Sequence, residues 1–235
     1  MGLVHLLHPV RPSRLDGPAP ASPREAVRTA AATAAVAVVL MVLVVGGWGP
    51  LVALDLMVAR ELHTSALEDP GFTQTNRVFS DWVWDPWTMR ALIAAVVLLL
   101  LLWRSAWLPA LWVAAASALG SAVQQGLKFL VGRERPSWSD PVDTAEYAAF
   151  PSGHAMTATV TCGLLLWLLR RRGTSPRVWR AAVAAAAVTV LGVGFTRLYL
   201  GVHWLTDVVA GWLLGVCLVA VAVASYDRWA LIWKR

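Results

Sequence analysis

Three groups of polar residues stand at the ends of long apolar runs, and their residue types suit chemistry on a phosphate ester. They are Lys128 with Arg135-Pro136, then Pro151-Ser152-Gly153-His154, then Arg197 with His203 and Asp207. Together they supply three cations that could bind an oxyanion and two histidines that could act as nucleophile or proton donor. They lack the clustered Cys, His and carboxylate ligands of a metal site.

His203 and Asp207 form the most informative pair. On a helix, residues four apart share a face, so Asp207 could accept the proton of one imidazole nitrogen and leave the other nitrogen free to attack. Arg197 precedes them at the junction of two apolar runs. Taken alone, a His/Asp pair is more often structural, and only the other two groups favour catalysis.

Lys128 and Arg135 bracket the end of an apolar run. Gly132 loosens the backbone between them, and Pro136 prevents the helix from continuing. The two cations could face one anion, with Arg135 bidentate and Lys128 as a point charge. Arg133, beside them, is expected only to anchor the chain at lipid headgroups.

The second group predicts the start of a helix. Ser152 is a candidate N-cap, and a helix N-terminus attracts anions. Gly153 would let the backbone approach an oxyanion, and His154 could donate a proton to the departing oxygen. The alternative is a capped helix whose histidine only hydrogen-bonds a neighbour.

The composition indicates a membrane protein. Hydrophobic residues make up 58% of the 235 positions and charged residues only 14%, which suits a helical membrane bundle. The formal charge of +6 does not indicate a nucleic-acid partner, because 18 of the 20 cations are Arg and most lie beside apolar runs. Cys162 and Cys217 fall within such runs and are expected to be free thiols.

The fold class predicted is all-α, an integral membrane bundle of six transmembrane helices with an extracytoplasmic segment between the first two. Arg90 lies inside the second run and must snorkel or pair. The apolar runs are Ala30 to Leu54, Trp87 to Trp103, Ser105 to Leu130, Phe150 to Leu169, Ala181 to Phe195 and Trp204 to Ser225. The domain boundaries expected are an N-terminal tail (1–28), the six-helix domain (29–226) and a C-terminal tail (227–235).

Charge asymmetry predicts the orientation. Arginines of the N-terminal tail, the loop between residues 170 and 180 and the C-terminal end fall on one side of a six-span bundle, whereas the segment from Asp55 to Asp85 is net acidic and falls on the other. The positive-inside rule makes the basic side cytoplasmic. We therefore expect a multi-pass protein of the cell membrane, with both termini cytoplasmic and all three polar groups on the extracytoplasmic face.

The three groups resemble the signature of the type 2 phosphatidic acid phosphatase family, a superfamily that also contains vanadium-dependent haloperoxidases. The likeness rests on six residues between Lys128 and Arg135-Pro136, on Pro151-Ser152-Gly153-His154, and on the spacing from Arg197 through His203 to Asp207. It covers residues 128–207 and departs from the family at Thr196, where Ser is usual.

The resemblance implies a role for each residue. His203 would be the nucleophile and form a phosphohistidine, Asp207 would orient it, and His154 would be the general acid. The phosphoryl oxygens would be held by Lys128, Arg135, Ser152, Gly153 and Arg197. No metal or cofactor is expected. The substrate would be a membrane lipid phosphate or diphosphate in the bilayer, hydrolysed at the extracytoplasmic face.

Alternatives remain open at this level. The same phosphohistidine could pass to an alcohol, which would make the protein a phosphotransferase. A non-enzymatic bundle or transporter is the third reading, in which the spacing of Gly211 and Gly215 only packs helices. A haloperoxidase is disfavoured because lipid-facing spans suit a lipid substrate. His63 receives no role, residues 137–149 are expected to form a rim over the pocket, and the sequence leaves the lipid and the oligomeric state undetermined.

Overall fold

The chain is helical throughout the part that the structure describes. The structure is a computed structural model that describes residues 22–102 and 106–232, and every regular element within these ranges is a helix. The elements are α1 (Pro23–Val45), α2 (Gly49–Glu68), α3 (Pro70–Val78), the π-helical segment η1 (Phe79–Val83), α4 (Pro86–Leu102), α5 (Trp107–Val131), α6 (Gly153–Arg171), α7 (Pro176–Tyr199) and α8 (Leu205–Ile232). The predicted all-α class is confirmed.

Short polar signals fix where the helices begin and end. Ser22 and Glu25 form a reciprocal capping box at the start of α1, and Ser175 caps α7 ahead of a proline in its first turn. Gly132 ends α5 with a left-handed backbone (φ 58°), a conformation that suits glycine. This end is important for the site, because the chain there leaves α5 and turns back across the bundle.

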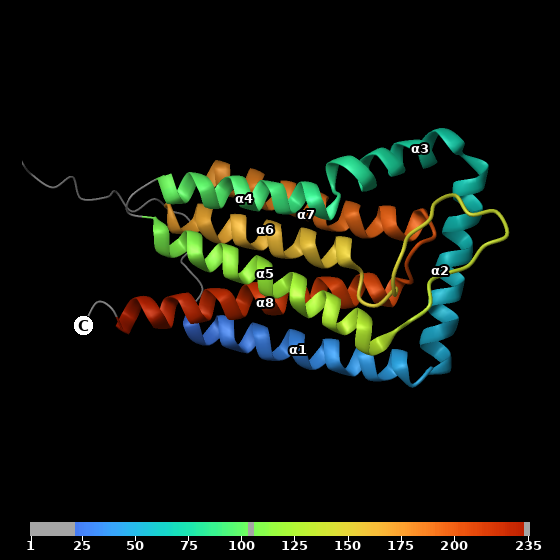
Figure 1. Ribbon diagram of the computed structural model, residues 1–235, viewed down its shortest axis with the longest axis horizontal. Coiled ribbons are helices and arrows are strands. Elements are labelled where there is room, and N and C mark those ends of the chain that lie inside the picture. Colours follow the sequence, from blue (N-terminus) through green and yellow to red (C-terminus); the bar gives the residue numbers. More distant parts are fainter. Residues whose placement is uncertain (1–21, 103–105, 233–235) are drawn as a thin grey trace, which may run out of the picture.

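The helices form an elongated bundle closed at one end (Figure 1). Helices α1, α4, α5, α6, α7 and α8 run side by side along the long axis, while α2 crosses one end of them. The connection from α5 to α6, residues 132–152, lies at that same end and passes beside α2. The loop from α7 to α8 is there too, so four helix ends and one long loop meet under α2.

Small residues let α8 approach α6 closely. A Cβ added at Gly211 would lie 2.8 Å from the backbone oxygen of Ser152, and one at Gly215 would lie 2.6 Å from Cβ of Thr159. The glycine pair therefore packs helices, as the sequence analysis considered. Because Ser152 immediately precedes α6, this close contact also fixes the position of Ser152, a predicted site residue, relative to α8.

Five helical segments are long and apolar enough to cross a membrane: Pro23–Val45, Pro70–Leu102, Trp107–Val131, Pro176–Tyr199 and Leu205–Trp229. Their outward-facing aliphatic side chains are exposed, for example Val42 on α1 and Leu191 on α7, as expected of surfaces that contact lipid. Helix α6 is not among the five; it carries His154, three threonines and two arginines in 19 residues. The span predicted from Phe150 to Leu169, which α6 covers, therefore stays a prediction.

One predicted helix boundary is wrong. The first apolar run does not extend to Leu54, because α1 ends at Val45, Gly47 adopts a left-handed backbone (φ 63°), and α2 begins at Gly49. Hydropathy alone does not show this turn, since apolar residues continue on both sides of it. Helix α1 begins at Pro23, within the expected tail 1–28, and α8 continues to Ile232, within the expected tail 227–235. A helix can extend beyond the membrane, so the domain boundaries stay predictions. Residues 1–21 and 233–235 lie outside the described part of the chain.

Candidate active site

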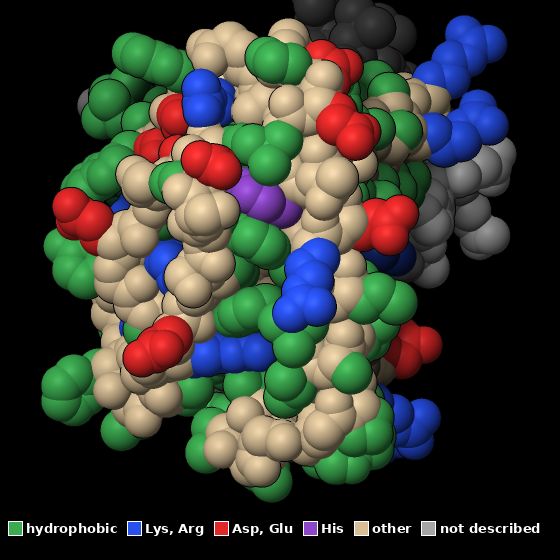
Figure 2. All heavy atoms as spheres, turned by 90° about the vertical axis from the view of Figure 1, so that its right-hand side faces the viewer, with side chains coloured by type: hydrophobic (Ala, Val, Ile, Leu, Met, Phe, Trp, Pro, Cys, Tyr) green, Lys and Arg blue, Asp and Glu red, His purple; other side chains and the backbone are tan. Residues whose placement is uncertain are grey.

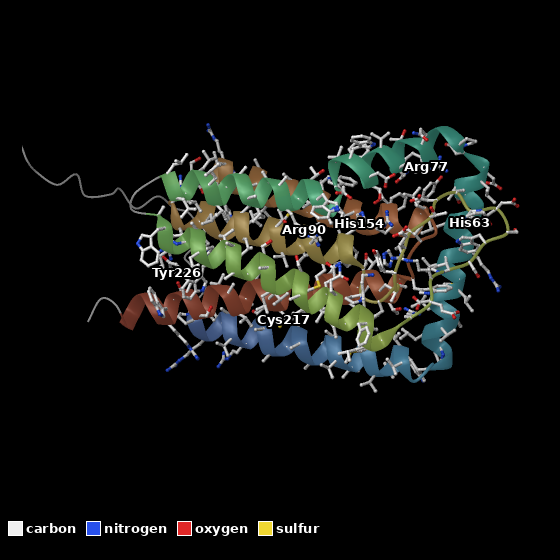
Figure 3. The ribbon with its side chains drawn as sticks, in the orientation of Figure 1. His63, Arg77, Arg90, His154, Cys217 and Tyr226 are labelled. Carbon is white, nitrogen blue, oxygen red and sulfur yellow. The ribbon has the colours of Figure 1, made fainter. Side chains whose placement is uncertain are left out.

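The three sequence groups meet at one end of the bundle. Lys128 lies in the last turn of α5, His154 in the first turn of α6, Arg197 in the last turn of α7 and Asp207 in the first turn of α8. Figure 3 shows His154 at the end of α6 that faces α2, far from Tyr226 near the opposite end. Residues separated by up to 79 positions are thus brought together because helix ends on one side of the bundle converge.

His203 and Asp207 form a buried pair. Nδ1 of the imidazole lies 3.4 Å from Oδ2 of Asp207, and both side chains are almost fully inaccessible (1% and 0% exposed). On its other side, Nε2 lies 3.1 Å from Nη1 of Arg135. An arginine can only donate, so Nε2 must accept and Nδ1 carries the proton toward Asp207. This is the tautomer in which Nε2 carries a lone pair and no proton, and that lone pair faces Arg135.

The surroundings of His203 keep its imidazole neutral. Burial lowers the pKa of His203 well below its ordinary value, and the charges of Arg135, Arg197 and Lys128 lower it further. A protonated imidazole could not act as a nucleophile, so the site holds this histidine in its reactive form at neutral pH. The same three cations are the groups that an incoming phosphate would meet.

Arg135 is held in place by backbone oxygens. Its Nε donates to Tyr147 O at 2.9 Å, its Nη2 to Glu146 O at 2.9 Å, and its Nη1 to Val202 O at 2.6 Å. Burial lowers the pKa of the guanidinium, although Asp207 and Asp143 oppose this shift. The contacts join the loop 132–152 to the loop before α8, and a rim formed by residues 137–149 stays a prediction.

The other two cations are also oriented by the protein. Lys128 Nζ donates to the backbone oxygen of Ala148, and Arg197 Nη1 donates to Ser80 Oγ at 2.6 Å. Ser80 belongs to η1, and π-helical turns often occur at functional sites. Nε of Arg197 is buried and has no hydrogen-bond partner among the described residues, so it remains available to a ligand.

The start of α6 contributes a second unpaired donor. Ser152 occupies the N-cap position, as predicted, but its hydroxyl makes no capping bond and is buried without a partner among the described residues. Gly153 is the first residue of the helix, and a Cβ there would lie 2.5 Å from Nε2 of Gln124. His154 lies close enough to Arg197 and His203 to interact electrostatically with both. An anion seated here would meet the helix N-terminus and the serine hydroxyl together.

Arg133 is not a headgroup anchor, and the prediction for it is wrong. Its Nη1 lies 2.6 Å from Oδ1 of Asp207, and its Nη2 lies 2.7 Å from Oδ2 of Asp55. The sequence analysis missed Asp55 as well, since it counted this residue only as part of an acidic segment. Its position in an otherwise apolar stretch of α2 is the available signal, because a lone carboxylate there needs a partner.

His63 also belongs to this end of the molecule, although the sequence analysis gave it no role. Its ring stacks on that of Trp138, with centroids 3.9 Å apart and planes inclined by 13°. Burial lowers the pKa of His63, opposed by the charge of Asp140. Trp138 in turn donates to Gly201 O at 2.9 Å, and a Cβ at Gly201 would lie 2.6 Å from the indole nitrogen. The stack therefore ties α2 to the loop before His203.

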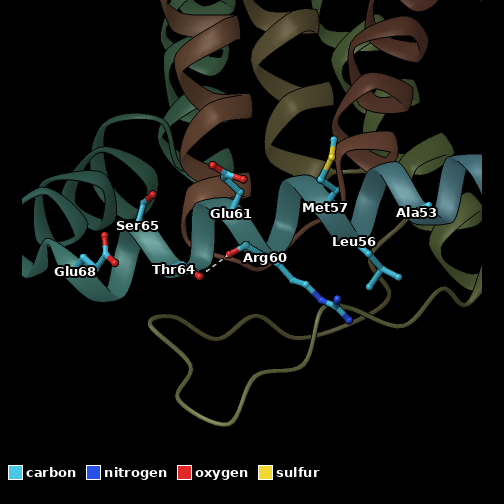
Figure 4. Close-up of a pocket in the computed structure, with 8 residues that line it drawn as sticks. All are labelled: Ala53, Leu56, Met57, Arg60, Glu61, Thr64, Ser65 and Glu68. Atoms are coloured by element: carbon cyan, nitrogen blue, oxygen red, sulfur yellow. Dashed lines mark hydrogen bonds between the residues drawn. The ribbon is translucent and has the colours of Figure 1, made fainter.

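The surface at this end of the molecule is hollowed beside α2. A cavity of about 780 Å³ lies along this helix, and the described residues that line it include none of the predicted site residues. Figure 4 shows these side chains: Ala53, Leu56, Met57, Arg60, Glu61, Thr64, Ser65 and Glu68. Viewed face on, this end of the molecule mixes acidic and basic side chains (Figure 2).

The side chains that converge suit an anion. Among residues 22–102 and 106–232, no three His, Cys, Asp or Glu side chains are grouped as the ligands of a metal ion would be. Cys162 and Cys217 are free thiols, as expected. What the site offers is three oriented cations, two unpaired donors and two histidines at the same end of the bundle, a set that can bind a phosphoryl group and attack its phosphorus.

The fold and the site describe a helical membrane protein with a candidate phosphate-binding site at one end of its bundle. Comparison with known proteins supports this description. The family described as the PAP2 superfamily matches residues 109–230. The chain belongs to this superfamily, and the resemblance noted from its three groups is confirmed.

Several curated proteins are similar over parts of the chain. Phosphatidylglycerophosphatase B of Bacillus subtilis is 34% identical over 104 residues, 43% of this chain and 50% of that protein. Undecaprenyl-diphosphatase of Sulfolobus acidocaldarius is 43% identical over 68 residues, 28% of each chain. Decaprenylphosphoryl-5-phosphoribose phosphatase of Mycobacterium tuberculosis is 32% identical over 171 residues, 71% of this chain and 86% of that one. The chain spans half or less of the length of the first two.

A solved structure shares the fold. The crystal structure of a transmembrane PAP2 type phosphatidylglycerolphosphate phosphatase from Bacillus subtilis superposes with a TM-score of 0.75, covering 85% of this chain and 96% of that one at 19% identity. This likeness supports the fold alone. Together with the five candidate spans, it identifies the chain as a multi-pass membrane protein.

Proposed function

We propose that this protein is a membrane phosphatase that removes a terminal phosphate from a lipid phosphate or diphosphate through a phosphohistidine intermediate, without a metal ion. One observation carries the proposal: the buried imidazole of His203 points Nδ1 at Asp207 and Nε2 at Arg135, close to the charges of three cations at one end of the bundle. The lipid class is supported by the relatives, whose names specify lipid phosphates or diphosphates.

The first chemical step is transfer of the phosphoryl group to His203. An incoming phosphate accepts hydrogen bonds from Arg135, Lys128 and Arg197, and it draws the Arg135 guanidinium away from Nε2. The Nε2 lone pair then forms a bond to phosphorus while the bond to the lipid oxygen breaks. His154 gives its proton to that oxygen, and Asp207 stabilises the charge that develops on the histidine ring.

The second step regenerates the enzyme. His154, now neutral, takes a proton from a water molecule, which attacks phosphorus as the bond to His203 breaks and phosphate leaves. Fixed cations are suited to both steps, because the negative charge on the phosphoryl oxygens is bound without reorganisation at the moment of reaction. If an alcohol replaced water, the same site would act as a phosphotransferase.

The proposed topology places six helices across the membrane, namely α1, α4, α5, α6, α7 and α8. Helix α6 runs between α7 and α8 in the bundle, so it crosses wherever they do (Figure 1). Arg170 and Arg171 end α6 at the face opposite the site, which makes that face cytoplasmic by the positive-inside rule. Both termini are then cytoplasmic and the site extracytoplasmic. Reporter fusions after residue 235 and in the 137–149 loop test this, and a cytoplasmic loop reporter contradicts it.

The function is tested on purified protein with a panel of lipids. Phosphatidate, phosphatidylglycerol phosphate, a polyprenyl diphosphate and decaprenylphosphoryl-5-phosphoribose are each assayed for phosphate release, with His203→Ala as the blank. Wild type should release phosphate from at least one lipid, and a chelator should leave the rate unchanged. Loss of activity on chelation would defeat the metal-free mechanism, whereas product analysis with added alcohols separates hydrolysis from transfer.

A further inference from the structure

The two carboxylate oxygens of Asp207 have different partners. Oδ2 faces Nδ1 of His203 at 3.4 Å and also accepts from the backbone N–H of Trp204 at 2.9 Å. Oδ1 accepts from Nη1 of Arg133 at 2.6 Å. A carboxylate held at both oxygens cannot rotate about its Cβ–Cγ bond. The contact of Oδ1 with Arg133 therefore determines that Oδ2 faces His203.

Arg133 is itself fixed by a second buried carboxylate. Its Nη2 donates to Oδ2 of Asp55 at 2.7 Å, and Asp55 is only 1% exposed. Its Nη1 also donates to Thr206 Oγ1 at 2.7 Å. The guanidinium thus connects Asp55 of α2 to Asp207 of α8, residues 152 positions apart, with one planar fork that suits two carboxylates.

Asp55 also caps the helix that carries Asp207. Its Oδ1 accepts from the backbone N–H of Thr206 at 3.0 Å, and its Oδ2 accepts from the Thr206 hydroxyl at 2.6 Å. Thr206 lies in the first turn of α8, where backbone N–H groups have no partner within the helix. A carboxylate from a distant helix therefore takes the place of a local capping side chain and completes the N-terminus of α8.

We propose that Asp55 and Arg133 are positioning residues that set the rotamer of Asp207 and, through it, the tautomer and orientation of His203. This inference rests on the proposed function of the site. It assigns α2, which crosses the end of the bundle, a part in the chemistry although neither Asp55 nor Arg133 need touch the substrate. The alternative is that Asp55 and Arg133 form an ion pair that only stabilises the fold. If they act by positioning, their effect on kcat requires the Asp207 carboxylate; if they only stabilise, it does not.

A double-mutant cycle separates them. Arg133→Gln and Asp55→Asn should each lower kcat by roughly 10²-fold, the cost of a small misplacement of reacting groups, with KM little changed. Placed in the Asp207→Asn background, each should lower kcat by less than about threefold more, because the contact through which it acts is already lost. Arg133→Lys, which keeps the charge, should recover part of the rate.

Two variants on α2 serve as matched controls. Arg60→Gln and Glu61→Gln remove a cation and a carboxylate from the exposed face of the same helix, and both should keep the wild-type kcat. Thermal unfolding in the same detergent reports stability separately. Losses that add fully in the Asp207→Asn background, or that follow the unfolding temperature alone, would overturn the proposal.

A spectroscopic measurement tests positioning without any substrate. The chain has five histidines, so nitrogen-15 labelled histidine gives few resonances, and His203→Asn assigns the relevant one. At pH 7.5 wild type should show a protonated Nδ1 and an unprotonated Nε2 at His203, whereas Arg133→Gln and Asp55→Asn should show mixed tautomers. An unchanged single tautomer in both variants would refute the proposal. If no lipid were hydrolysed by wild type, the proposed function would fail while this measurement still decided the positioning.

Discussion

Nη1 of Arg135 lies 3.1 Å from Nε2 of His203, the ring nitrogen that faces away from Asp207. The guanidinium thereby identifies Nε2 as the acceptor and also occupies it. In the proposed mechanism, a phosphate that draws Arg135 onto its own oxygens would free this lone pair as the phosphorus arrives. Substrate binding would then expose the nucleophile.

His203→Ala should abolish turnover, because no other described side chain at the site is both buried and held with a lone pair facing the cations. Phosphate release and trapping of radiolabelled phosphoprotein after acid-free quenching measure the loss. Wild type should trap label and the variant should not. Undiminished turnover in the variant would remove His203 as the nucleophile.

Asp207→Asn should give a slow enzyme that folds. An amide in place of the carboxylate presents a donor to Nδ1 and favours the wrong tautomer, which behind a catalytic histidine lowers kcat by about 10⁴-fold. Arg133 keeps Asp55 as its partner, so the fold should survive. Steady-state kinetics measure the loss of kcat, and thermal unfolding tests whether the fold is kept. A near wild-type kcat would contradict the prediction.

The acid limb of the kcat/KM profile should lie below pH 6.5. His203 must be neutral to attack, its ordinary pKa is about 6.5, and burial with three nearby cations lowers its pKa well below that. The neutral form is thus complete above pH 6.5 and is lost only as the pH falls through the lowered pKa. His154 must carry a proton in the complex, so kcat should also fall at alkaline pH. A kcat/KM that stays constant as the pH falls to 6.5 and declines only at lower pH agrees with the lowered pKa of His203, whereas an acid midpoint above pH 6.5 contradicts it.

Arg135→Gln should lower kcat/KM by about 10² to 10³-fold, the usual cost of removing one donor to a developing oxyanion. The variant also loses the contact that holds Val202 O beside the histidine. Steady-state kinetics on the hydrolysed lipid measure the change, with the exposed Arg60→Gln as the matched control for removing one positive charge. Equal effects of the two substitutions would indicate a general electrostatic role in place of direct contact.

Gly211→Ala should destabilise the protein and reduce its activity. The added methyl would lie 2.8 Å from the backbone oxygen of Ser152, and overpacking of this kind costs about 1–3 kcal/mol. Gly126→Ala is the control, because nothing lies within 4 Å of a Cβ there, and alanine inside a helix is favoured by about 0.5–1 kcal/mol. Thermal unfolding should separate the two variants in opposite directions.

The sequence determined the class of the protein and most of the groups that meet at the site. Apolar runs of membrane-spanning length require helices, because backbone polar groups in lipid must be paired within their own segment. The spacing from Arg197 through His203 to Asp207 already places a cation, a histidine and its carboxylate at one helix junction. These features can be predicted from the sequence because they depend on residues that are close together along the chain.

Only the tertiary structure decided which residues stand behind that pair. Asp55 is one acid in a largely apolar stretch and Arg133 one of eighteen arginines, and no periodicity relates them to Asp207. The turn at Gly46–Gly47 is a different case: hydropathy does not show it, but the Gly-Gly and Gly49-Pro50 pairs are local turn signals. The contacts of Asp55 and Arg133 depend on how separate helices pack, and packing brings together positions whose separation along the chain carries no signal.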